Sequence, residues 1–141
     1  MRIKSGSIMG LAVGLATAVA IGAASFFALQ TLWPAYAAAV PDKSFTLSML
    51  MTRLLLGVLS TAAAACVATR IAMDDGRTAW RLGVLFLAVS LPNHMFAVWD
   101  DYPAWYHVVY LGYLVPIAGL TGQMTASKNR AGIWKTPTAL L

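Results

Sequence analysis

Side chains that can carry chemistry gather in one short stretch of this chain, residues 91–110. Both histidines of the protein, His94 and His107, lie there, together with Asp100 and Asp101, two of its five acidic residues. Imidazole and carboxylate groups bind metals, move protons and recognise charged ligands. Apolar runs flank the stretch on both sides, so it reads as the exit of one membrane helix, a tight turn and the entry of the next.

A basic residue from an earlier apolar run, Arg53, belongs with this stretch once the runs are stacked as membrane helices. Ionisable groups at membrane depth are costly, so a cluster of them at one depth is by default a site. We therefore predict a polar cluster in the outer leaflet of the membrane, at which a ligand binds. Its candidate residues are Arg53, Asn93, His94, Asp100, Asp101, Tyr102, His107 and Tyr110.

Three interpretations of this cluster remain open. The first is a metal or haem site with His94 and His107 as the candidate ligands, although twelve intervening residues match no ligand signature and the cofactor stays unknown. The second is a pocket for a small ligand or lipid, in which Arg53 meets an anionic headgroup and aromatic residues form the walls. The third is structural, with the aromatic residues as an interfacial belt and the charges as a cap on the helices.

The composition identifies the elements that position these residues. The chain has 141 residues, of which 60% are hydrophobic and only 11% charged. Apolar runs of about 18 or more residues suffice to cross a bilayer. We predict an all-α fold, an integral membrane four-helix bundle with short loops, forming a single domain over residues 1–141. The expected helices span residues 8–32, 46–72, 80–98 and 104–125, and a basic cytoplasmic tail occupies residues 127–141.

Basic residues mark the expected orientation, because Lys and Arg in short loops favour the cytoplasmic side. Only Lys43 lies in the first or third connection. We therefore expect a multi-pass protein of a bacterial-type inner (plasma) membrane, with the N- and C-termini in the cytoplasm. The net charge of +5 then reflects topology and indicates no nucleic-acid partner. The basic residues on the expected cytoplasmic side are Arg2, Lys4, Arg70, Arg77, Arg81, Lys128, Arg130 and Lys135.

The first helix carries a small residue at every fourth position, which is the pattern of close helix packing in membranes. This stripe predicts packing within the chain, and homo-oligomerisation through it is the alternative. We expect the helix to be retained, since its apolar run exceeds that of a usual signal peptide; cleavage would leave three helices. The stripe consists of Gly6, Gly10, Gly14, Ala18 and Gly22.

Arg53 is the most informative residue of the second helix, because a charge at this depth costs at least about 2.5–3.5 kcal/mol on insertion scales. The residues that share its helical face are small or weakly polar, as suits the interior of a bundle. One interpretation is therefore an inward arginine paired with Asp100 or Asp101. The other is an arginine whose side chain extends to the outer headgroups and binds lipid phosphate.

The sequence has no glycine-rich phosphate loop, no His-Glu-x-x-His helix and no nucleophile elbow. The motifs Pro92-x-His94 and Tyr102-Pro103-x-Trp105 resemble those of small four-helix bacterial membrane proteins, and this resemblance implies no activity. We expect a non-catalytic accessory subunit that binds lipid or a partner, within the membrane or a larger membrane complex. The alternative is a membrane enzyme or transporter that uses a ligand site or a metal or haem site formed by Arg53, His94, Asp100 or Asp101, and His107.

Overall fold

The computed structural model describes residues 5–131, and these residues form an all-α fold. Four long helices are joined by short connections, and a short helix, a π-helical turn and a 3₁₀ turn complete the described part. The elements are α1 (Ser5–Leu32), α2 (Pro34–Ala39), α3 (Leu47–Ala72), α4 (Arg77–Pro92), the π turn η1 (Asn93–Ala97), the 3₁₀ turn η2 (Trp99–Asp101) and α5 (Ala104–Arg130).

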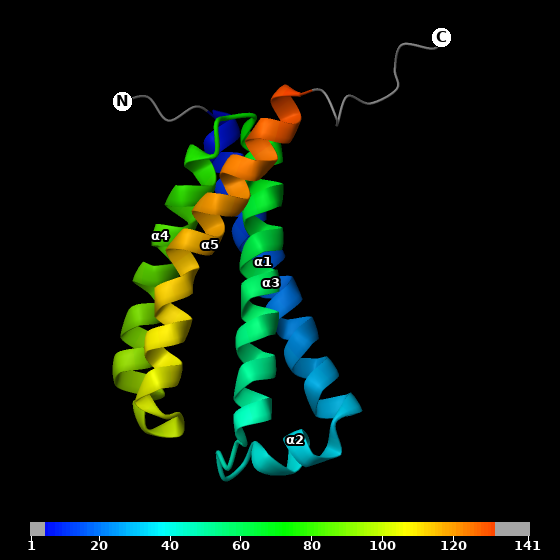
Figure 1. Cartoon of the computed structure of the whole chain (residues 1–141), viewed down its shortest axis with the longest axis vertical. Helices are drawn as coiled ribbons and strands as arrows, with labels where there is room; N and C mark the ends of the chain where they lie inside the picture. The colour runs from blue at the N-terminus through cyan, green and yellow to red at the C-terminus, as the bar shows by residue number, and fades with distance from the viewer. Residues whose placement is uncertain (1–4, 132–141) are drawn as a thin grey trace.

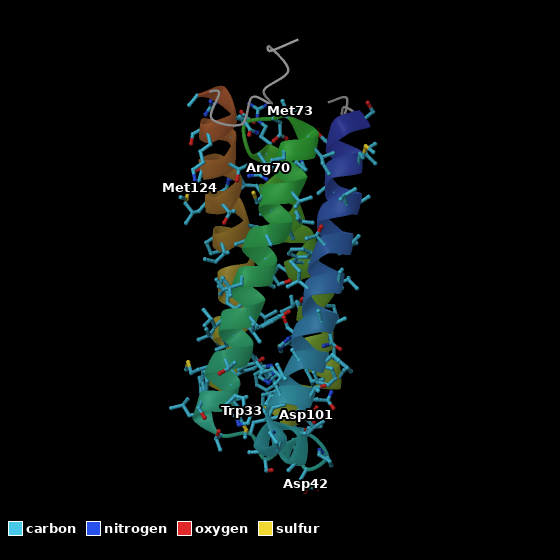
Figure 2. The ribbon with its side chains drawn as sticks, turned by 90° about the vertical axis from the view of Figure 1, so that its right-hand side faces the viewer. Trp33, Asp42, Arg70, Met73, Asp101 and Met124 are labelled. Atoms are coloured by element: carbon cyan, nitrogen blue, oxygen red, sulfur yellow. The ribbon has the colours of Figure 1, made fainter. Side chains whose placement is uncertain are left out.

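The long helices form two antiparallel pairs, α1 with α3 and α4 with α5, and α3 also packs against α4 and α5 (Figure 1). We call one end of the molecule the basic end; it holds the starts of α1 and α4 and the ends of α3 and α5. The other end, with α2 and residues 93–103, is the aromatic end. Figure 2 places Arg70 at the basic end and Trp33, Asp42 and Asp101 at the aromatic end.

Three helices, α1, α3 and α5, are long and apolar enough to cross a membrane, by length and composition. They identify a membrane protein, as the sequence predicts. Helix α4 is shorter, with 16 residues, and it passes directly into the π turn. The change follows Pro92, whose ring nitrogen has no hydrogen to donate to the preceding turn. Beyond it, Val98 donates to the carbonyl of Asn93, the wider spacing of a π turn.

Small residues hold the helices close together at the basic end. A Cβ added to Gly10 would lie 2.6 Å from the carbonyl oxygen of Ala68, and one added to Gly14 would lie 2.9 Å from Leu82 Cδ2. Gly122 of α5 meets Ala79 of α4 in the same way. The predicted stripe on α1 therefore packs within the chain over this half of the helix.

The stripe does not stay packed along the whole of α1. A Cβ added to Gly22 would meet no atom within 4 Å, whereas Gly6, Gly10 and Gly14 all lie against α3. The ribbons of the α1–α3 pair and the α4–α5 pair diverge toward the aromatic end (Figure 1), where large side chains such as Phe45, Tyr102 and Tyr106 pack between α3 and α5. The packing of small residues thus closes one half of the molecule and leaves space in the other.

Several predicted boundaries need correction. The start of α4 is Arg77 rather than residue 80, because Asp74 accepts hydrogen bonds from the backbone of Gly76 and Thr78 and so caps the helix early. Helix α5 continues to Arg130, so residues 127–130 belong to a helix and not to a tail. The loop expected after Pro34 contains α2, since proline suits the first turn of a helix. The remaining predicted tail, 132–141, lies outside the described residues.

Candidate ligand-binding site

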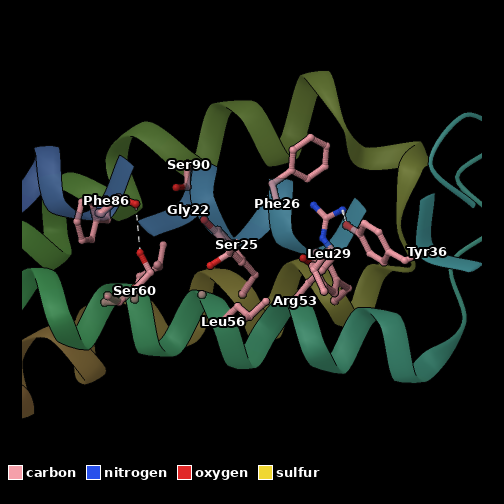
Figure 3. A pocket seen from close by; sticks show the side chains of 16 residues that line it. Gly22, Ser25, Phe26, Leu29, Tyr36, Arg53, Leu56, Ser60, Phe86 and Ser90 are labelled. Atoms are coloured by element: carbon pink, nitrogen blue, oxygen red, sulfur yellow. Dashed lines mark hydrogen bonds between the residues drawn. The ribbon is translucent and has the colours of Figure 1, made fainter. Parts of the chain in front are cut away.

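Arg53 points into the interior of the molecule from the second turn of α3. One of its guanidinium nitrogens donates a hydrogen bond of 2.9 Å to the hydroxyl of Tyr36, which is fully buried (Figure 3). The guanidinium carbon lies 5.4 Å from the ring centre of Phe45 and 4.9 Å from that of Tyr102. Tyr106 of α5 also interacts electrostatically with the guanidinium of Arg53. Aromatic side chains from α2, α5 and two connections therefore hold this cation.

No carboxylate of the described residues lies within ion-pair distance of Arg53. Asp101 pairs instead with Lys43, at 3.3 Å, and Asp100 is exposed without an ion pair. The predicted ion pair of Arg53 with Asp100 or Asp101 is therefore wrong, because the aspartates lie on the outer side of the turn. The arginine faces inward without a counter-charge, and the rings of Phe45 and Tyr102 contact its guanidinium by cation–π interactions.

A cavity of about 240 Å³ lies beside Arg53, between all four long helices (Figure 3). It is open on one side, and it occupies the half of the molecule in which α1 leaves the close packing at Gly22. Apolar side chains such as Phe26, Leu29 and Phe86 form much of its wall, and Tyr106 and Tyr110 line it from α5. Besides the tyrosines, its polar residues are Arg53 and the hydroxyl-bearing Ser25, Ser60, Thr61 and Ser90.

The two histidines contact each other, with their Nδ1 atoms 2.8 Å apart. Nε2 of His107 faces the carbonyl oxygens of Trp99, at 3.1 Å, and Tyr102, at 3.3 Å. Since a carbonyl only accepts, this Nε2 carries a hydrogen and donates it to the turn. The two Nδ1 atoms then share one further hydrogen. Three of the four ring nitrogens are therefore engaged in contacts within the protein.

Aromatic rings enclose this pair. His94 stacks on Tyr110, with the ring centres 4.4 Å apart, and His107 stacks on Trp99 at 4.8 Å. Both imidazoles are buried. Such stacking fixes the π turn, the 3₁₀ turn and the start of α5 to one another. The histidine pair therefore acts as a connection between elements at the aromatic end.

The described residues contain no group of three or more His, Cys, Asp or Glu side chains that could hold a metal ion. The two metal candidates, His94 and His107, turn their Nδ1 atoms toward each other at hydrogen-bond distance. Two imidazoles alone are fewer protein ligands than the three or four usual for a zinc centre. This donor set does not fit a metal centre of that kind.

The structure divides the predicted cluster into two groups. Arg53, Tyr102 and Tyr110 lie around the cavity and its aromatic wall, and the histidine pair adjoins them through Tyr110. Asn93 and Asp100 are exposed and contribute no side chain to either group. Asn93 serves through its backbone carbonyl, which accepts the bond that closes the π turn.

Sequence reasoning missed several residues of the cavity. Tyr36 lies in α2, between the first two predicted membrane helices, and α2 folds it back so that its hydroxyl reaches Arg53, 17 positions away in the chain. No local spacing signals that return. Ser60 and Thr61 share a helical face with Arg53, and this spacing is a usable signal. Ser25 and Ser90, on two other helices, have no sequence signal that connects them with Arg53.

Comparison of the chain with known protein families, with curated proteins and with solved structures found no match.

Proposed function

We propose that this is a four-span membrane protein that binds an anionic amphiphile in the cavity beside Arg53. In this proposal α4 and η1 together form the fourth span, since they run alongside α5 and connect the two ends of the molecule. The membrane is a bacterial-type inner membrane, and the basic end faces the cytoplasm. Membrane lipids are then both the solvent of the outer faces and the source of the ligand.

The observation that carries this proposal is the cationic side chain without an anion. Arg53 lies six residues inside the start of α3, which corresponds to a depth of about 9 Å. Arg53 is half-buried, and an opposite charge stabilises a charge that is partly removed from water. The anionic headgroup of a ligand, a carboxylate or a phosphate, would supply the missing charge, and Tyr36 holds one side of the guanidinium in place to receive it.

The surroundings of Arg53 suit the apolar part of such a ligand. A second hollow, of about 650 Å³, lies next to the cavity and shares Ser25, Leu29 and Leu56 with it. Its wall is almost entirely apolar. An acyl chain that begins at Arg53 could therefore leave the cavity along this hollow and rejoin the bilayer, so the cavity need not enclose the whole ligand.

The residues of the cavity favour binding over catalysis. Its wall contains no carboxylate, histidine or thiol, the groups that most often transfer protons or attack a substrate. An enzyme or transporter using the cluster would need free histidine nitrogens directed at the ligand. Three of the four are engaged within the protein, which supports a structural role for the histidines.

Co-purification tests the proposal. The protein and its Arg53→Gln variant are extracted in mild detergent, and the bound lipid is identified and counted by native mass spectrometry. Because a hydrogen bond to a charged group contributes about 1.5–3 kcal/mol, we expect the variant to hold the anionic lipid about 10- to 150-fold more weakly. The identity of the released lipid distinguishes a phosphate headgroup from a carboxylate.

Arg77→Gln is the matched control, since it removes the same charge from an exposed position at the basic end. Helicity, measured by circular dichroism, shows whether each variant is folded. Equal retention of anionic lipid by the folded Arg53→Gln and Arg77→Gln variants would contradict the proposal. Retention of only zwitterionic lipids by the unaltered protein would contradict it as well.

A further inference from the structure

Hydroxyl groups from three helices line the cavity at a level deeper than Arg53. Ser25 comes from α1, Thr61 from α3 and Ser90 from α4, and Figure 3 shows Ser25 and Ser90 on facing helices. No residue of the described part of the chain forms a hydrogen bond with any of these three side chains. Their hydroxyls are therefore available to whatever occupies the cavity.

The hydroxyl of Thr69 on α3, outside the cavity, is also without a partner, but several other helical hydroxyls are bonded within their own helix. Serine and threonine in helices commonly satisfy themselves by donating to the carbonyl of the preceding turn. Thr17, Thr52 and Thr125, which lie outside this cavity, do so at 2.8 Å. Ser60 lines the cavity but donates across to the Ala18 carbonyl, at 3.2 Å. Ser25, Thr61 and Ser90 make neither kind of bond.

The position of the free hydroxyls relative to Arg53 sets the distance between the two polar levels of the cavity. Thr61 follows Arg53 by eight residues on the same helix, which is a little over two turns, so the two residues share a face and their Cα atoms lie about 12 Å apart along the axis. The hydroxyls of Ser25, Thr61 and Ser90 face the open cavity, where a hydrogen-bonding group of a ligand can reach them. The cavity thus offers a positive charge at one level and hydrogen-bonding groups at another.

We infer that the ligand has two polar parts: an anionic head that meets Arg53, and a hydroxyl or similar hydrogen-bonding group farther along its chain that meets Ser25, Thr61 and Ser90. Hydroxylated fatty acids are the simplest amphiphiles of this chemistry. This inference rests on the proposed function, to which it adds the class of ligand. Under it, the site discriminates between acids that differ only in the position of one hydroxyl.

The test compares three acids on the purified, delipidated full-length protein: stearate, 2-hydroxystearate and 10-hydroxystearate. The hydroxyl of 10-hydroxystearate lies about as far from the carboxylate as Thr61 lies from Arg53, whereas that of 2-hydroxystearate lies beside it. The measurement is the mole fraction of acid in zwitterionic micelles that half-saturates the protein. One hydrogen bond gained corresponds to a preference of about five- to tenfold for 10-hydroxystearate.

The matching variant removes the three hydroxyls with little change in shape, as Ser25→Ala, Thr61→Val and Ser90→Ala combined. Because these groups bond to no other described residue, we expect the variant to fold and to bind 10-hydroxystearate no more tightly than stearate. Ser90→Ala alone is the second variant, for the case that the combination does not fold, and it should reduce the preference by half or more.

The outcomes separate this inference from the proposed function. Equal binding of the three acids, or an unchanged preference in the folded variant, overturns the two-part ligand; the proposed function still stands if Arg53→Gln weakens the binding of all three. If Arg53→Gln leaves the binding of every acid unchanged, the proposed function itself fails. A preference for 2-hydroxystearate would place the second polar contact beside Arg53 and would also overturn the inference.

Discussion

Two leucine substitutions on the same face of α1 give opposite predictions. In Gly14→Leu, the new Cβ would lie 2.9 Å from Leu82 Cδ2, 3.0 Å from Ala68 Cβ and 3.1 Å from the carbonyl oxygen of Ala64. The carbonyl belongs to the backbone of α3 and can move only if the helix moves. In Gly22→Leu, the new Cβ would meet no atom within 4 Å.

The expected difference in unfolding free energy between the two variants follows from the contacts at the two sites. Replacing glycine in a helix gains up to about 1 kcal/mol of propensity, and this gain is common to both variants. Overpacking a close contact costs about 1–3 kcal/mol, and this cost applies only to Gly14→Leu. We therefore expect Gly14→Leu to unfold more readily than Gly22→Leu by about 1–3 kcal/mol, or about 5- to 150-fold in the unfolding equilibrium.

The assay is reversible unfolding by dodecyl sulfate in mixed micelles, followed by circular dichroism, with lipid retention measured on the same samples. Gly22→Leu should be as stable as the unaltered protein or more stable by up to about 1 kcal/mol, and it should lose the anionic lipid, because its side chain enters the cavity. The reasoning is refuted if the two variants are equally unstable, or if Gly22→Leu retains the lipid in full.

Three further predictions concern the ends of the molecule. His107→Phe should destabilise the protein by about 2 kcal/mol and lower its melting temperature, because two carbonyls of the turn and the imidazole of His94 lose their partner. Lipid retention should persist in this variant. Loss of lipid without loss of stability would instead show that His107 contacts the ligand. Asp74→Ala should lower the free energy of unfolding by about 1–2 kcal/mol in the dodecyl sulfate assay, since three hydrogen bonds at the start of α4 disappear. An unchanged unfolding midpoint would show that these bonds contribute nothing to stability. In a Cys66→Ala background, a cysteine at Asp42 should react with an impermeant maleimide on intact cells and one at Ser127 should not; the reverse pattern would invert the proposed orientation.

The long helices are predictable from the sequence because each follows from a sustained apolar run. The helix from 46 to 72 differs from α3 by one residue at its start, where Thr46 serves as the N-cap. Irregular elements are harder to predict from the sequence. Helix α2 and the π turn depend on how the chain returns at the aromatic end, and Pro34 and Pro92 mark only where the regular pattern changes.

Part of the candidate site could be predicted from the sequence, because one of its residues interrupts an apolar run. Arg53 stands out because a lone charge inside an apolar run needs an explanation. The small residues on its helical face suit an inward direction, but the sequence leaves open the alternative that its side chain extends to the outer headgroups. Its partners were not accessible, since Tyr36 and Phe45 reach it through the fold of α2 and the following loop. The two histidines were candidates because they are the only two in the sequence, but nothing in their spacing predicts that their side chains contact each other.

The most direct test of the account is an experimental density map of the protein extracted together with its native lipids. The account predicts elongated density that begins at the guanidinium of Arg53, passes the hydroxyls of Ser25 and Ser90 and leaves between α1 and α3. A cavity that holds only separate water molecules, with lipid density confined to the outer faces of the helices, would contradict it.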